Sequence, residues 1–262
     1  MDPVAFSIGS FAIHWYGVFV AAGFLAGLWT AGRRGLRDRL SPQKMSDLGP
    51  WIIVGALIGA RSLYVLSYWK EDFAGQSWVN IFMIRNGGLV YYGGFIGAVL
   101  SAILFCRWKQ LPLWKVADAF APSVALGHAL GRIGCLMTGC CYGKVCQLPW
   151  GIRFPSGHIT HPHAVHPTQI YEALLNLLLY LGLAVLYRRK QFDGQIFALY
   201  LVGYALLRAG TEMFRGDYAD HNITGLLTPG QQIGVGILLA GVALYGVRSP
   251  FLSRFGKARK DE

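Results

Sequence analysis

Seven long apolar runs constrain this chain more than any other feature of its sequence. They occupy residues 11–30, 49–68, 89–106, 116–137, 167–187, 194–214 and 230–247. A helix that spans a bilayer needs about 20 predominantly apolar residues. Lipid offers backbone groups no hydrogen-bond partner, so each run is predicted to be helical. Membrane β-barrels show alternating segments of about ten residues instead. We therefore predict an all-α, polytopic integral membrane protein with about seven transmembrane helices.

Composition and charge agree with this prediction. Only 14% of the residues are charged and 54% are hydrophobic, whereas soluble domains carry about 25% charged residues. The formal net charge of +11 could indicate nucleic-acid binding in another chain. Here the positive residues fall in short segments between apolar runs, and no RNA or DNA motif is visible. We therefore expect the lipid bilayer as a partner and no nucleic acid.

Lysine and arginine gather in alternate segments between the runs. Arg33 and Arg34 follow the first run, and Arg188 and Arg189 follow the fifth. Positive segments stay in the cytoplasm, so the N-terminus is predicted outside and the C-terminus in the cytoplasm. We expect one transmembrane domain over residues 1–262. Residues 138–165 are long for a loop and form a possible small extracytoplasmic subdomain.

Several ionisable residues lie inside the apolar runs. Arg132 follows His128 by four residues, Arg208 precedes Glu212 by four, and Arg61 lies in the second run. Charges at membrane depth are costly unless paired or hydrated, so these residues are functional candidates. One interpretation is a structural ion pair that fixes helix packing. The other is an anion site, because guanidinium binds phosphate through several donors and keeps its charge when buried.

Glycines cluster near these charges. Gly55 and Gly59, and likewise Gly93 and Gly97, have the spacing of closely packed membrane helices. A second group surrounds the end of the fourth run and suggests a bend that opens toward a lipid headgroup: Gly134, Gly139 and Gly143.

Ordered motifs extend over nearly the whole chain. The most specific begins at Asp118, continues through Gly131-Arg132-Ile133-Gly134 and ends at Gly143. The others, in chain order, are His14–Gly17, Ile58–Arg61, Gly87-Gly88 with Gly93-Gly94, His166–Glu172, Arg208–Asp217 and Pro229–Gln231. Together these motifs resemble the signature of bacterial prolipoprotein diacylglyceryl transferases.

The resemblance implies a transferase of the bacterial cytoplasmic (inner) membrane, crossing it several times. Such an enzyme moves the diacylglyceryl group of phosphatidylglycerol to the lipobox cysteine thiol of a preprolipoprotein signal peptide. The product is a thioether, and glycerol phosphate leaves, in the first step of lipoprotein maturation. We expect no cofactor.

The resemblance also implies roles for individual residues. Arg132 and Arg208 would bind the lipid phosphate and support its departure, and Glu212 would orient Arg208 or take a proton. Tyr92 stands where the family commonly has histidine. Three roles are open for Tyr92: a proton acceptor, a hydrogen-bonding group that positions substrate, or a packing residue. A phenol with a pKa near 10 is a weak base at neutral pH. The expected substrate-binding residues are Arg132, Tyr16, Arg61, Gly93, Gly94, Gly134 and Gly143.

Four cysteines, Cys135, Cys140, Cys141 and Cys146, fall within twelve residues. Their spacing is not a common zinc-ligand pattern, so we expect no metal. An oxidising outer compartment would permit a disulfide, for example from Cys146 to Cys140 or Cys141. Otherwise these are small buried thiols.

Three other functions compete with the transferase. A divergent paralogue would bind phosphatidylglycerol and serve another acceptor, and Tyr92 with the cysteine-rich segment favours it. A transporter would show discontinuous helices in two repeated halves, and no such repeat is visible. A thiol–disulfide membrane protein would need a C-x-x-C pair, which this sequence lacks.

Overall fold

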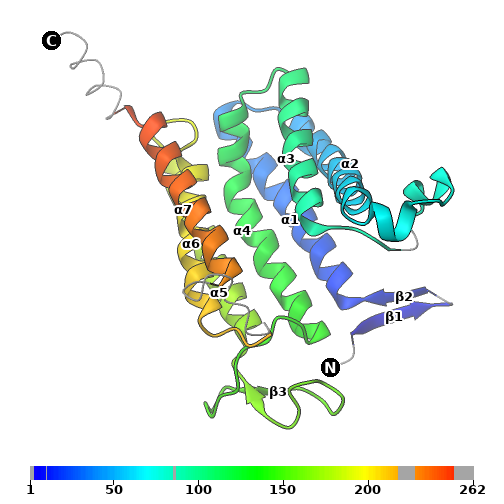
Figure 1. Cartoon of the computed structure of the whole chain (residues 1–262). Coiled ribbons are helices and arrows are strands. Elements are labelled where there is room, and N and C mark those ends of the chain that lie inside the picture. Colours follow the sequence, from blue (N-terminus) through cyan, green and yellow to red (C-terminus); the bar gives the residue numbers. More distant parts are fainter. Residues whose placement is uncertain (1–2, 10, 85–86, 218–227, 251–262) are drawn as a thin grey trace. The chain divides into compact units, whose positions relative to one another are not determined.

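Long helices dominate this computed structural model, which describes residues 3–9, 11–84, 87–217 and 228–250 (Figure 1). Within these ranges the seven long helices are α1 (Trp15–Gly35), α2 (Pro42–Ser67), α3 (Tyr91–Trp108), α4 (Leu113–Thr138), α5 (Thr168–Leu186), α6 (Gln195–Glu212) and α7 (Pro229–Arg248). Each predicted span overlaps one of them. The prediction of an all-α polytopic fold is confirmed.

Shorter elements connect these helices. They are strands β1 (Val4–Ile8), β2 (Phe11–His14), β3 (Ile152–Arg153) and β4 (Ala164–Val165), 3-10 helices η1 (Leu36–Asp38), η3 (Trp78–Phe82) and η5 (Tyr187–Arg189), and π-helix η2 (Trp69–Phe73). The first predicted span began too early, because β2 pairs with β1 in an antiparallel hairpin. Gly9 follows β1 with φ +61, a conformation that glycine adopts at little cost in a tight hairpin.

Not all seven helices are equally apolar. Among the described residues, five stretches are long and apolar enough to cross a membrane: Trp15–Asp38, Pro42–Ser67, Tyr91–Trp108, Thr168–Arg189 and Gly230–Arg248. Helices α4 and α6, which carry Arg132, Arg208 and Glu212, are not among them. The count of seven spans and the orientation therefore stay predictions.

Helix α5 has the polarity expected of a helix in lipid. Its fully buried side chains are polar, with Glu172 1% exposed and Asn176 0%. Its most exposed side chains are apolar and include Leu174, Leu178, Leu181 and Val185. A helix on the surface of a soluble protein buries apolar residues and exposes polar ones. The reversed pattern fits a helix surrounded by hydrocarbon.

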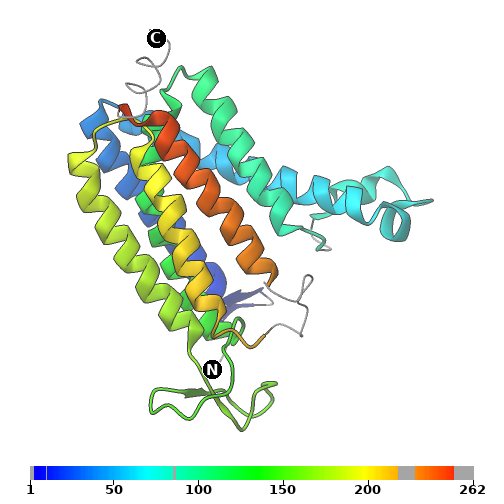
Figure 2. The same cartoon turned by 60° about the vertical axis from the view of Figure 1, so that its left-hand side comes forward.

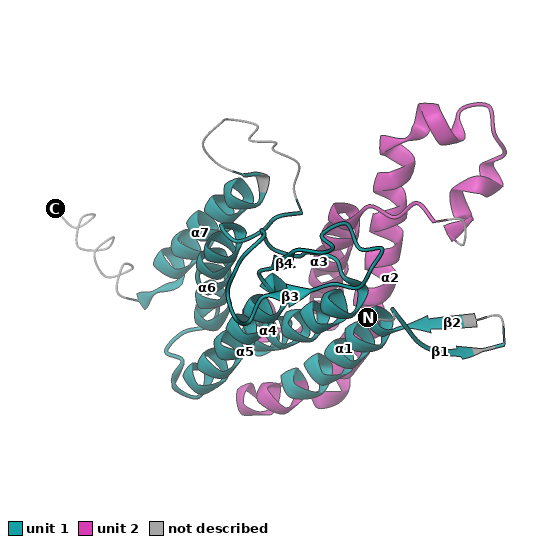
Figure 3. Ribbon diagram, turned by 90° about the horizontal axis from the view of Figure 1, so that it is seen from below, with its two compact units in different colours: residues 1–31, 117–262 teal, residues 32–116 magenta. Residues whose placement is uncertain are grey.

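The chain divides into two compact units, residues 1–31 with 117–262, and residues 32–116 (Figure 3). In the first unit α5, α6 and α7 lie side by side (Figures 1 and 2). Helix α1 crosses α4 closely, since a Cβ on Gly23 would lie 3.2 Å from Gly127 Cα. The hydroxyls of Thr30 and Ser123 join the same two helices at 2.8 Å.

A buried acid of α4 holds the start of α6. The Asp118 carboxylate accepts hydrogen bonds from Gly194 N at 2.9 Å and Phe197 N at 3.0 Å. These amides belong to the first turn of α6, where backbone N–H groups lack helical partners and the helix dipole favours negative charge. Lys190 Nζ lies 3.4 Å from the same carboxylate. Asp118 thereby ties α4 to α6 at the end of α6 opposite Glu212.

In the second unit α2 and α3 pack through glycines. A Cβ on Gly55 would lie 2.7 Å from Gly97 O, and one on Gly59 would lie 2.8 Å from Gly97 Cα. Side chains at these positions would force the helices apart. The interpretation of these glycines as a close helix crossing is confirmed.

Candidate functional site

Three helices of the first unit each direct a charged group into one buried cluster. Arg132 comes from α4, Glu172 from α5, and Arg208 with Glu212 from α6. The side chain of Glu172 is 2% exposed, and those of Arg132 and Arg208 are 14% and 12% exposed. The structure therefore brings together three sequence-predicted residues, Arg132, Arg208 and Glu212, around one further acid.

The two carboxylates link the two arginines. Glu172 Oε2 lies 2.7 Å from Arg132 Nε, and Glu172 Oε1 lies 3.7 Å from Arg208 Nη1. Arg208 Nη1 also forms an ion pair with Glu212 Oε2, four residues along α6. His128 accepts a hydrogen bond from Arg132 Nε at 3.1 Å. The sequence suggested either structural ion pairs or an anion site. This cluster has features of both, because the arginines are ion-paired and come from separate helices.

Arg132 keeps part of its guanidinium available for a ligand. Its contacts with His128 and Glu172 use Nε. The terminal Nη atoms form no hydrogen bond with any residue that the structure describes. A guanidinium anchored at Nε presents its outer fork in a fixed orientation, which suits bidentate binding of a phosphate.

Helix α7 approaches this cluster with its N-terminus. Thr228 caps α7 in a capping box with Gln231, and its hydroxyl donates to Glu212 Oε1 at 3.0 Å. A Cβ on Gly230 would lie 2.9 Å from the Glu212 carboxyl carbon, so glycine permits this approach. The N-terminal end of α7 therefore lies beside the Glu212 carboxylate, on the helix that also carries Arg208.

The loop after α4 forms a small sheet-like structure at the helix ends. Gly143 N donates to His166 O at 3.0 Å, and Lys144 N donates to Phe214 O at 2.8 Å. A Cβ on Gly143 would lie 2.6 Å from His166 O. Backbone segments therefore cross at Gly143 with no room for a side chain, and a substrate-binding role for this glycine stays a prediction.

Arg215 lies in the segment that pairs with this loop. Its guanidinium binds Asp217 through two hydrogen bonds, Nε to Oδ1 at 2.9 Å and Nη2 to Oδ2 at 2.6 Å. Arg215 also interacts electrostatically with Glu172 and Arg132. A third cation therefore belongs to the surroundings of the buried cluster.

Tyr16 lies beside the last turns of α4. A Cβ on Gly134 would lie 3.1 Å from Tyr16 Cα, so Gly134 permits a close crossing of α1 and α4. Tyr16 is 47% exposed and interacts electrostatically with Arg132. Its hydroxyl is thus placed near the predicted phosphate-binding arginine.

The remaining predicted site residues belong to the second unit. Arg61 donates from Nε to Ile81 O at 2.7 Å, from Nη2 to Asn80 O at 2.6 Å, and from Nη1 to the carbonyls of Gly87 and Gly88 at 2.8 and 3.1 Å. Four backbone carbonyls therefore occupy this guanidinium, which holds the segment between α2 and α3 in place. These contacts account for Arg61 as a residue that positions this segment, and a substrate-binding role for it stays a prediction.

Residues at the start of α3 divide into exposed and packed groups. Tyr92 is 58% exposed and its ring meets that of Tyr91 edge-on at 5.8 Å. Gly93 is buried, and a Cβ there would lie 2.5 Å from Leu63 Cβ; one on Gly94 would lie 3.4 Å from Ala56 O. Both glycines face α2, which accounts for them as packing residues. A role for Tyr92 in chemistry stays a prediction.

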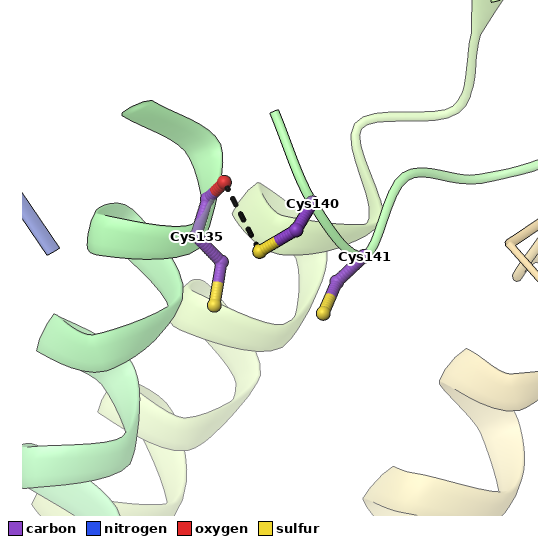
Figure 4. Close-up of side chains that lie close together, drawn as sticks. All are labelled: Cys135, Cys140 and Cys141. Atoms are coloured by element: carbon purple, nitrogen blue, oxygen red, sulfur yellow. Dashed lines mark hydrogen bonds between the residues drawn. The ribbon is translucent and has the colours of Figure 1, made fainter. Parts of the chain in front are cut away.

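Three of the four clustered cysteines meet at the end of α4. The Sγ atoms of Cys135, Cys140 and Cys141 lie within 4.8 Å of one another (Figure 4). Hydrogen bonds with the Cys135 and Cys141 thiols lower the pKa of the Cys140 thiol. All cysteines lie in the described ranges and are thiols, so no disulfide links Cys146 to Cys140 or Cys141. Cys146 lies instead beside Gly151.

Glu172 is the site residue that the sequence analysis did not single out. It appeared only as the last residue of the His166–Glu172 motif. An acid inside an apolar run is itself a signal, because buried charges in membranes are rare and usually paired. Applied to the fifth run, that argument would have selected Glu172 together with Arg132 and Arg208.

Comparison with known proteins gives matches over most of the chain. A family model described as prolipoprotein diacylglyceryl transferase matches residues 3–247. A phosphatidylglycerol–prolipoprotein diacylglyceryl transferase of Finegoldia magna is 36% identical over 245 residues, 93% of this chain and 94% of the relative. Proteins of the same name from Legionella pneumophila strain Paris and Synechocystis are 34% and 33% identical, over 94% and 92% of this chain and 96% and 87% of their own lengths.

Proposed function

Because the chain belongs to the prolipoprotein diacylglyceryl transferase family, we propose that it transfers the diacylglyceryl group of phosphatidylglycerol to a cysteine thiol of prolipoproteins. The acceptor is the lipobox cysteine at the end of a preprolipoprotein signal peptide. The transfer forms a thioether and releases glycerol phosphate.

One observation carries the assignment of the site: Glu172 joins Arg132 and Arg208 inside the first unit. Buried guanidinium groups from different helices suit a phosphodiester, and the outer fork of Arg132 has no other partner among the described residues. We assign Arg132 and Arg208 to the lipid phosphate, and Tyr16 to the headgroup beside them.

The charge changes of the reaction explain why cations are needed. A thiolate attacks the glyceryl carbon, the carbon–oxygen bond to phosphate breaks, and a carbon–sulfur bond forms. The phosphate starts with one negative charge and leaves as a phosphate monoester with a second. Preorganised cations in a site that excludes water stabilise charge that grows in this way. The negative charge passes from the thiolate to the leaving phosphate, where Arg132 and Arg208 receive it.

The acceptor thiol must first lose its proton. An unperturbed thiol has a pKa of about 8.5, and burial in apolar surroundings raises it. Glu212 is assigned to hold Arg208 in position rather than to take this proton, because the two residues form an ion pair four residues apart on α6. Tyr92 is assigned to the acceptor side of the reaction, as a hydrogen-bonding group or a proton acceptor.

We place the protein in the bacterial cytoplasmic membrane, with the N-terminus outside. The positive segments after the first, third and fifth runs support this orientation. It places the C-terminal end of α4, the segment 138–165 and the start of α5 on the outer side. An acceptor delivered across the membrane would then meet the lipid on that side.

Complementation tests the proposal. The chain and its Arg132→Ala variant are expressed in a bacterium depleted of its own diacylglyceryl transferase. The mass of a reporter lipoprotein is then measured by mass spectrometry. Arg189→Ala is the matched control, because Arg189 is an exposed arginine beyond α5. The wild type and Arg189→Ala should add a diacylglyceryl group, and Arg132→Ala should not.

One outcome is that the wild type inserts normally while the reporter stays unmodified. In that case the assay is repeated with lipoproteins from the protein's own source. If those also stay unmodified, the transferase proposal fails. The second candidate, a divergent paralogue with a different acceptor, then applies. It is distinguished by glycerol phosphate release from phosphatidylglycerol without lipidation of any lipobox peptide.

A further inference from the structure

Three thiols at the end of α4 have no role in the proposed transfer, since the nucleophile there belongs to the acceptor. Cys135 is in the last turns of α4, and Cys140 and Cys141 follow in the turn after it. Figure 4 shows the three side chains converging beside the start of α5, with the three Sγ atoms within 4.8 Å of one another. The cluster combines three strong ligands for soft metals in one place.

The backbone builds this cluster by ending α4 abruptly. Cys140 N donates to Cys135 O, and Gly139 N donates to Leu136 O, both at 3.2 Å. With Gly139 at φ +77, these bonds form a Schellman motif, which turns the chain back over the last helical turn. Cys140 is thereby returned to Cys135, although five residues separate them in the sequence.

Cys141 extends the turn in a conformation that is unfavourable for its residue type. Its φ is +61, in the left-handed region where the Cβ of a non-glycine residue crowds the backbone. Glycine would adopt this conformation without that crowding. The chain instead keeps a thiol at this position, next to two others.

Helix α5 fixes both cysteines of the turn from behind. Thr168 Oγ1 donates to Cys141 O at 2.6 Å, and Gln169 Nε2 donates to Cys140 O at 2.7 Å. Thr168 and Gln169 are both fully buried. Outer contacts of this kind orient ligands around metal ions, and here they hold the backbone that carries two of the three sulfurs.

From this geometry we propose that Cys135, Cys140 and Cys141 bind one thiophilic metal ion, with Zn²⁺ the first candidate. Zinc–sulfur bonds of about 2.3 Å place three sulfurs roughly 3.8–4.0 Å apart. The present separations, all within 4.8 Å, need to shrink by no more than about 1 Å. The sequence spacing argued against a metal only because it did not include the turn that brings Cys140 back to Cys135.

Charge and access are compatible with this site. Binding of Zn²⁺ to three neutral thiols releases three protons and leaves a three-thiolate complex with one negative charge. Arg132 interacts electrostatically with Cys141 and Cys135 and would balance that charge. Cys140 is exposed, which gives the ion a route to the buried Cys135 and leaves one coordination position open.

Metal content of the purified full chain tests the proposal. The protein is reduced in detergent, given Zn²⁺, freed of excess metal and measured by elemental mass spectrometry. Co²⁺ replaces Zn²⁺ in a parallel sample, in which thiolate ligands produce a charge-transfer absorption. The variants are Cys140→Ser and Cys141→Ser, with Cys146→Ser as the matched control. Wild type and Cys146→Ser should bind about one ion per chain, and the two variants should bind at least about tenfold more weakly.

Cys140→Ser decides the result if Cys141→Ser fails to fold, because Cys140 is exposed; its elution volume and thermal unfolding must match the wild type. Binding that is lost equally in Cys146→Ser overturns the proposal. So does wild-type protein that takes up no Zn²⁺ after complete reduction. A disulfide within the cluster, found by peptide mass spectrometry in a chain that still binds no metal once reduced, overturns it as well.

Discussion

Glu172 Oε2 lies 2.7 Å from Arg132 Nε, while the other oxygen of the same carboxylate lies 3.7 Å from Arg208 Nη1. A single acid from α5 therefore positions two arginines that come from α4 and α6. The two arginines are thereby linked through one carboxylate, and Arg208 has Glu212 as a further partner. We therefore expect the proposed phosphate site to depend on Glu172 as well as on the arginines.

Substitution of Glu172 by glutamine should lower activity strongly. The amide keeps the shape of the side chain but replaces the carboxylate with a neutral group, so Arg132 and Arg208 lose their common anchor. Misplacement of groups by about 1 Å costs about 10²-fold in rate. We expect a loss of about that size in the initial rate of reporter lipidation by purified enzyme.

Glu71→Gln is the control for this variant, because Glu71 is an exposed acid in η2 of the other unit. Its rate should equal that of the wild type. Thermal unfolding in detergent is measured for both variants, since removing one partner of a buried ion pair costs about 3–5 kcal/mol. Full activity of Glu172→Gln would show that the arginines do not need this carboxylate.

The Arg132→Lys variant separates charge from geometry. Lysine keeps the positive charge but cannot both contact Glu172 and present a second pair of donors, because its ammonium is a single point charge. We expect the lipidation rate to fall by about 10–100-fold, which corresponds to about 1.4–2.7 kcal/mol. The result is checked by steady-state kinetics with phosphatidylglycerol and a lipobox peptide. A wild-type rate would mean that only the charge at this position matters.

How far the sequence predicts this molecule differs from feature to feature. The long helices followed from apolar runs, because helices in lipid must be long and apolar whatever their neighbours. The start of α1 did not, because pairing of residues 11–14 with β1 depends on a local turn rather than on hydropathy. Arg132, Arg208 and Glu212 stood out because charge is rare at membrane depth.

Other parts of the site depend on contacts between distant segments. The cysteine cluster required the Schellman turn at Gly139, and linear spacing does not show which way a helix end turns. The carbonyl partners of Arg61 lie 19–27 residues away. The sequence alone therefore could not show which buried arginine holds a loop and which has donors left for a phosphate. The structure distinguishes the two, because backbone carbonyls bind Arg61 and the outer donors of Arg132 stay available.

The hydroxyl of Tyr92 can be tested with its neighbour as control. Tyr92→Phe removes only the oxygen, and Tyr91→Phe does the same one residue earlier; both rings are well exposed, so neither change should alter stability. We expect Tyr92→Phe to lower the lipidation rate by at least about tenfold, with a larger loss, about 10²-fold or more, if the phenol accepts the thiol proton.

Tyr92→His completes this experiment, because the resemblance drawn from the sequence implies a histidine at this position. Histidine should retain activity and shift the pH dependence toward its own pKa of about 6.5. Equal rates for wild type, Tyr92→Phe and Tyr91→Phe would assign Tyr92 to packing.

Close packing in the second unit predicts that one added methyl group destabilises the protein. A Cβ on Gly97 would lie 3.0 Å from Gly59 Cα, and backbone atoms cannot move aside as a flexible side chain can. Overpacking of this kind costs about 1–3 kcal/mol, so Gly97→Ala should lower the midpoint of thermal unfolding in detergent.

Gly182→Ala in α5 is the matched control, because a Cβ there meets nothing within 4 Å. Alanine is favoured over glycine within a helix by about 1 kcal/mol, so Gly182→Ala should be neutral or stabilising. If both variants shift the midpoint equally, the α2–α3 crossing is looser than the glycine contacts require.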